Sequence, residues 1–187
     1  MNIVTEDLQH NQEQIQRRAR QLFDTQELNN SASVDHWFGA LLLSQWLVAV
    51  VVALGLSPQT WTGLSSHAHL HVWAAIFLGA AVISLPLSLI WRHPGRVFTR
   101  HVVAITQMLF SVLFIHLSGG RIETHFHVFG SLAFLAFYRD WRVLISSAIV
   151  VVADHVLRGI FAPQSVYGVA LIEPLRWIEH GGWVVFE

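Results

Sequence analysis

Blocks of about twenty apolar residues, separated by short polar turns, dominate this sequence of 187 residues. This is the length that a helix needs to cross the hydrocarbon core of a bilayer, about 20 residues. Hydrophobic residues make up 53% of the chain and charged residues only 12%, which excludes an ordinary soluble domain. The pattern therefore predicts an all-α fold, a polytopic membrane helical bundle.

Five apolar segments are predicted to span the membrane: about Trp37 to Leu56, His69 to Trp91, Val97 to Leu117, a shorter one from His125 to Tyr138, and Val143 to Phe161. A further apolar stretch begins near Trp177 and stops at Glu187, short of a full crossing. We interpret it as the start of a sixth span, truncated in or before that last helix. The transmembrane domain then covers residues 36–187.

Residues 1–35 are predicted to form a cytosolic amphipathic helix or linker. The polar run Asn29 to Ser33 is expected to end this helix before the membrane. Two uses of this helix remain open. It is either a solvated lead-in or a short coiled coil that forms a homodimer, since four apolar residues fall near a 3.5-residue period: Val4, Leu8, Ile15 and Leu22.

Arginine is distributed unevenly between the two sides of the predicted bundle. Eight of the 11 basic residues precede the first span or lie in the turns around residues 92–100 and 139–142. Cytoplasmic loops carry an excess of Lys and Arg, so the N-terminus is predicted to be cytoplasmic. The near-zero net charge gives no support for a nucleic-acid partner.

Histidines gather at the other, non-cytoplasmic ends of the predicted spans. Eight of the 12 lie there: His67, His69, His71, His116, His125, His127, His155 and His180. Ionisable residues at membrane depth are functional candidates, and imidazoles with carboxylates bind transition metals. With Glu123 and Asp154, these residues predict a site for one or two ions of iron, copper or zinc, with haem as the alternative.

Simpler roles are open for single residues of this set. Any one interfacial histidine is also explained as a water-facing, hydrogen-bonded residue. Asp154 and Arg158 are four residues apart, which favours a structural ion pair on a helix. His67 and His71 share a helical face if their helix starts early. Gln107, in mid-span, predicts a hydrogen bond between helices.

The run Gly119-Gly120-Arg121-Ile122-Glu123-Thr124-His125-Phe126-His127-Val128-Phe129-Gly130, continued by Ala136 to Trp141, resembles a multi-pass membrane input domain of bacterial signalling proteins. Such domains precede histidine kinase, chemotaxis-receptor or diguanylate cyclase modules. The resemblance, which covers about residues 36–187, implies a sensor domain in the bacterial inner membrane. No kinase, methyl-accepting or cyclase motif is present, so we expect the chain itself to be non-catalytic and its output module to be missing.

The leading hypothesis is therefore a membrane sensory domain. Its outer histidine layer would bind a metal and couple metal, gas or redox sensing to a cytoplasmic output, with a histidine kinase as one candidate parent. The alternatives are a membrane metalloenzyme of the di-iron oxidase kind, a bis-histidine haem protein and, last, a metal transporter, which would need polar groups along a whole pathway. The motifs here are HxH, whereas membrane desaturases carry longer-spaced boxes on the cytosolic side.

Overall fold

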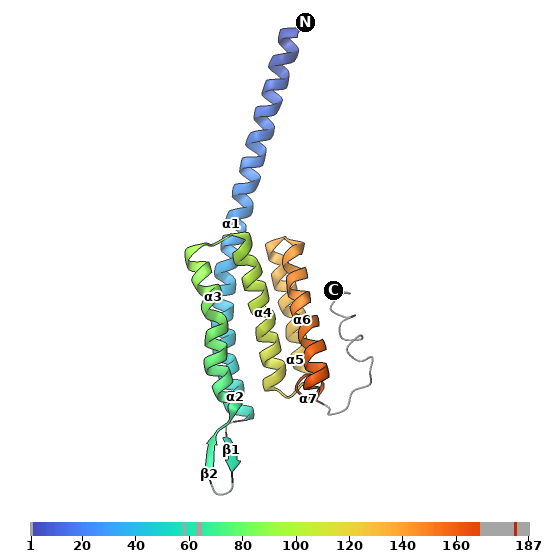
Figure 1. The fold of residues 1–187 in the computed structure, drawn as a ribbon. Coiled ribbons are helices and arrows are strands. Elements are labelled where there is room, and N and C mark those ends of the chain that lie inside the picture. The colour runs from blue at the N-terminus through green and yellow to red at the C-terminus, as the bar shows by residue number, and fades with distance from the viewer. Residues whose placement is uncertain (1, 58, 63–64, 169–181, 183–187) are drawn as a thin grey trace.

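The computed structural model describes residues 2–57, 59–62, 65–168 and 182. They form a helical bundle with one small hairpin (Figure 1). The elements are α1 (Asn2–Leu56), β1 (Gln59–Thr62), β2 (Ser65–Ala68), α2 (Leu70–Trp73), the π-helix η1 (Ala74–Leu78), α3 (Gly79–Arg92), α4 (Val97–Leu117), α5 (Ile122–Leu135), the 3-10 helix η2 (Ala136–Tyr138), α6 (Trp141–Phe161) and α7 (Gln164–Tyr167).

Helix α4 lies in the middle of the bundle and packs against α1, α3, α5, α6 and α7. The hairpin projects from one end of the bundle, and the N-terminal half of α1 projects from the other (Figure 1). We call these the hairpin end and the opposite end. The antiparallel strands β1 and β2, with Thr60 paired to His67, lie between α1 and α2 in the chain.

Four helical stretches in the described residues are long and apolar enough to cross a membrane: His10–Leu56, Leu70–Arg92, Val97–Leu117 and Trp141–Phe161. Their outer faces expose large apolar side chains such as Val51, Phe77 and Ile149, as lipid-facing surfaces do. Helix α5, the predicted fourth span, has 14 residues and is shorter than these. The predicted sixth span lies outside the described residues.

The predicted helix break at Asn29 to Ser33 does not occur, because α1 continues through this segment. Its polar side chains are accommodated within or beside the helix. Ser33 Oγ donates to the Asn29 carbonyl (3.0 Å), and Asn30 Nδ2 donates to the Phe137 carbonyl (3.3 Å). Ser31 is fully buried. Tertiary contacts at the opposite end therefore override the local preference of these residues for a turn.

A polar network fastens α1 to the two connections at the opposite end. Asp35, which is fully buried, accepts hydrogen bonds from the Gly95 N–H and the Tyr138 O–H, both at 2.6 Å. Arg100 of α4 contacts Glu27 at 3.1 Å and Asp140 at 3.4 Å. We call this network the clasp. It joins α1, the residue 92–96 turn, α4 and the residue 136–140 turn.

Candidate functional site

Three imidazoles meet at the hairpin end, where α2 begins and α4 ends. The His69 and His71 ring centroids lie 4.3 Å apart, and those of His71 and His116 lie 4.9 Å apart, both edge to face. His69 is the N-cap of α2, and its Nδ1 accepts the His71 backbone N–H at 3.1 Å. This cap fixes the start of the helix at Leu70, so His67 lies on β2 and not on the same helical face as His71.

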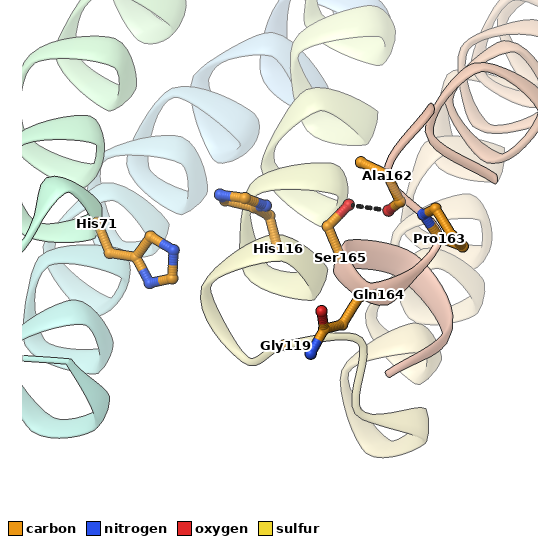
Figure 2. Close-up of a pocket in the computed structure, with 7 residues that line it drawn as sticks. All are labelled: His71, His116, Gly119, Ala162, Pro163, Gln164 and Ser165. Carbon is orange, nitrogen blue, oxygen red and sulfur yellow. Dashed lines mark hydrogen bonds between the residues drawn. The ribbon is translucent and has the colours of Figure 1, made fainter. Parts of the chain in front are cut away.

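A pocket of about 520 Å³ adjoins this cluster. Its lining residues are His71, His116, Gly119 and residues 162–165, and His116 lies between His71 and Ser165 in the view (Figure 2). The side chains of His71 and His116 point toward one another across the view. His71 Nδ1 is buried and has no hydrogen-bond partner among the described residues. A buried polar atom of this kind is costly when it has no partner.

Gly119 of the Gly119-Gly120 turn lines this pocket just after α4. Both residues have positive φ, 70° and 76°. A Cβ at Gly120 would overlap the Gly168 backbone nitrogen and lie 2.8 Å from the carbonyl carbon and oxygen of Val166. The turn is therefore packed directly on the backbone at the C-terminal end of α7, and glycine is needed at position 120 for space as well as for conformation.

A second pair of histidines joins α5 to α6. The ring centroids of His125 and His155 are 5.6 Å apart, and the two residues are only 7% and 5% exposed. His125 Nδ1 donates to the Arg121 carbonyl (2.9 Å), and His155 Nδ1 donates to the Val151 carbonyl (3.0 Å). Each bond fixes a tautomer in which Nε2 carries the lone pair of the neutral ring.

The carboxylate of Asp154 serves mainly as an ion-pair partner, as the four-residue spacing predicted. Arg158 contacts both of its oxygens at 2.6 Å. Asp154 Oδ2 also lies 3.5 Å from His155 Nδ1. The Tyr167 ring stacks edge to face on His155, with centroids 6.3 Å apart, and extends this cluster toward α7.

His127 does not join His125. Residues two apart on a helix point about 200° apart, and His127 faces the bundle interior. Gln45 Nε2 lies 3.1 Å from its Nε2, and Ser111 Oγ lies 2.8 Å from its Nδ1. The predicted HxH pair therefore serves two different environments, one between α5 and α6 and one between α1 and α4.

The other predicted ligands lie apart from these groups. His67 is exposed on the hairpin, Glu123 is exposed in the first turn of α5, and His180 lies outside the described residues. Within the described part of the chain, no three histidine or carboxylate side chains form a group arranged to hold a metal ion. The metal site remains a prediction.

Sequence reasoning missed Gln45, Ser111 and Ser131, which surround His127. A signal for Gln45 was present, since an amide in the middle of an apolar span is unusual. The structure confirms the predicted hydrogen bond of Gln107 between helices, because its Nε2 donates to Ser131 Oγ of α5 at 2.8 Å.

The chain is similar in part to a transducer protein. It is 36% identical over 90 residues to the transducer protein Htr8 of Halobacterium salinarum, a match that covers 46% of this chain and 14% of the transducer. No protein-family model and no solved structure matches the chain. The match and the membrane-length helices together support a helical membrane domain with a signalling role.

Proposed function

We propose that this chain is a membrane-embedded sensory input domain whose histidine clusters at the hairpin end bind a transition metal. The observation that carries the proposal is the group formed by His69, His71 and His116 at a pocket, in a chain similar to a transducer.

His71 and His116 are the residues best suited to hold a metal. They come from different helices, they face each other, and His71 Nδ1 is buried without a hydrogen-bond partner in the described part of the chain. His69 Nδ1 is engaged in capping, which leaves its Nε2. His125 and His155 offer a second pair between α5 and α6. A bound iron, copper or zinc ion would supply a coordination position at which a gas or another small ligand, or a redox change, acts.

Helix α4 provides the route from this site to the opposite end. His116 lies in its last turn, and Arg100 lies in its first turn, about 24 Å away at 1.5 Å per residue. Arg100 contacts Glu27 of α1 and Asp140 before α6. A small shift of α4 relative to α2 would therefore move a residue of the clasp, and α1 would carry the change beyond the bundle. Such rigid helix shifts are an established way of switching.

The test is metal analysis of the protein, purified by a route that leaves no polyhistidine tag, in wild-type and variant forms. We expect one to two bound ions per chain, and a loss of metal in His71→Ala and in His116→Ala. Affinity should fall by more than the roughly 10–100-fold typical of losing an outer hydrogen-bond partner. His67→Ala is the matched control, because His67 is exposed on β2, and it should retain the metal.

A folded, stable protein that carries no metal and does not bind added zinc, iron or copper would contradict the metal site. Equal loss in all three variants would indicate general destabilisation instead of ligation. A Soret absorption band that vanishes in the same variants would replace the ion with haem while leaving the histidine assignment intact.

A further inference from the structure

The helix that carries His71 contains one wide turn. The π-helix η1 begins three residues after His71 and joins α2 to α3 in one continuous helical stretch. At its end the Gly79 N–H bonds to the Ala74 carbonyl, five residues earlier, and to the Ile76 carbonyl. In an α-helix the same N–H would bond to the Ala75 carbonyl, four residues earlier. A π-turn of this kind is rare and accommodates one extra residue in the helix.

A tryptophan of α1 binds the carbonyl oxygens of this turn. Trp46 Nε1 donates to the Ala75 carbonyl and to the Ile76 carbonyl, at 3.2 Å each. The Ala75 carbonyl, from which the π-turn takes its α-helical donor, therefore has the indole N–H instead. Such a donor is important within a membrane span, because the lipid core has no water to bind a carbonyl.

Gly79 makes room for the indole ring. Its φ of −58° is ordinary for a helix, so the backbone conformation does not require glycine. Alanine is the better residue inside a helix. A Cβ at position 79, however, would lie only 2.7 Å from Trp46 Cδ1 and 3.2 Å from Trp46 Nε1. The helix therefore has a glycine at the place where the indole must approach closely to reach the two carbonyls.

The extra residue of the π-turn sets the direction in which His71 points. His71 and His116 face each other, with ring centroids 4.9 Å apart (Figure 2). Successive residues of an α-helix are rotated by about 100°, so an α-helical turn in place of η1 would rotate α2 by that angle relative to α3. Val72 would then take the place opposite His116 that His71 has now.

We propose that Trp46 is a positioning residue for the histidine cluster at the hairpin end. By binding the Ala75 and Ile76 carbonyls it keeps η1 in its π-form, and the π-form holds His71 opposite His116. When the indole N–H is removed, the Ala75 carbonyl regains a donor if the turn becomes α-helical, and that change moves His71 away. The inference rests on the proposed function only for what this placement serves, the binding of a metal.

The experiment measures the rotation of α2 by bridging pairs of cysteines in the full chain in nanodiscs. Because the chain has no cysteine, His71→Cys/His116→Cys and Val72→Cys/His116→Cys each provide one defined pair of thiols. A short bifunctional methanethiosulfonate bridges the pair, and intact mass spectrometry follows the rate.

We expect the 71–116 pair to be bridged at least about fivefold faster than the 72–116 pair, because residues rotated by about 100° point in different directions. In the Trp46→Phe background, which keeps an aromatic ring but no N–H, this order should reverse. A general loss of stability would change both rates in the same direction and would not reverse their order.

Two further variants separate placement from folding. Gly79→Ala keeps the indole, but its methyl group would collide with the ring, so we expect the same reversal as in Trp46→Phe. Trp37→Phe is the matched control, because Trp37 lies on the same helix and is 79% exposed. It should keep the wild-type order. The wild-type order in folded Trp46→Phe, or in Gly79→Ala where Trp46→Phe does not fold, would overturn the proposal.

Metal affinity is measured separately, with added zinc and with both histidines in place. Trp46→Phe should weaken zinc binding by about 10–100-fold, the loss typical of removing a group that orients a ligand. Reversed bridging in a protein that binds no metal would support the role of Trp46 and contradict only the metal site. Unchanged bridging and unchanged zinc affinity in Trp46→Phe would contradict the role of Trp46 and leave the metal site intact.

Discussion

The helical position of each histidine decides which partners the His125-Phe126-His127 motif contacts. His125 and His127 look alike in the sequence, yet one pairs with His155 and the other bonds with Gln45 and Ser111. The spacing of two is typical of neighbours on one face of a strand, whereas on a helix it separates two side chains. A motif of two histidines is thus divided between a cluster at the hairpin end and an interior network.

The Gly-Gly turn supplies a matched pair of substitutions at this scale. Gly120→Ala should lower the melting temperature of the detergent-solubilised protein strongly, because it combines positive φ with a Cβ that would overlap the backbone at Val166 and Gly168. Gly119→Ala has positive φ too, but its Cβ would meet nothing within 4 Å. Gly119→Ala should therefore lower the free energy of unfolding only by the strain of placing a side chain at positive φ, about 1 kcal/mol. Equal effects would show that the close packing on residues 166–168 is unimportant.

At the scale of elements, periodicity and length predicted most of the helices well. The third and fifth predicted spans correspond to α4 and α6, and the ion pair of Asp154 with Arg158 was predicted from their spacing. The continuity of α1 was not predictable, because it depends on Asp35 and Asn30 finding partners more than sixty residues away in other segments. Local sequence shows that such residues favour a break, but not that the clasp holds Asp35 and that the Phe137 carbonyl binds Asn30.

Removing one hydroxyl should loosen the clasp. Tyr138→Phe deletes the donor to Asp35 Oδ1 while keeping the stacking of the ring on Phe38, whose centroid lies 5.6 Å away. The buried carboxyl group loses one partner, which we expect to cost about 1–3 kcal/mol of unfolding free energy. Thermal or denaturant unfolding in detergent measures this. Ser84→Ala removes an exposed hydroxyl bonded only to its own helix and should change stability little.

At the scale of the whole molecule, the sequence predicted a histidine layer at one end, and the structure divides that layer into smaller groups. His71 and His116 come together because α2 starts beside the end of α4, and this depends on the His69 cap and the hairpin. Neither could be read from composition or spacing.

The orientation of the whole bundle in the membrane can be tested by a single labelling experiment. The chain has no cysteine, so single cysteines can be introduced without background. Arg121 is exposed at the hairpin end beside the start of α5, and Arg96 is exposed at the opposite end before α4. The arginine bias predicts that the hairpin end faces the outside of the cell.

A membrane-impermeant maleimide added to intact cells should then label Arg121→Cys, and should label Arg96→Cys only after permeabilisation. Gln59→Cys, exposed on β1, should behave like Arg121→Cys and serves as a second reporter of the same end. The reverse pattern would place the histidines on the cytoplasmic side and the N-terminal half of α1 outside. The proposed path from α4 through α1 could then not reach a cytoplasmic output.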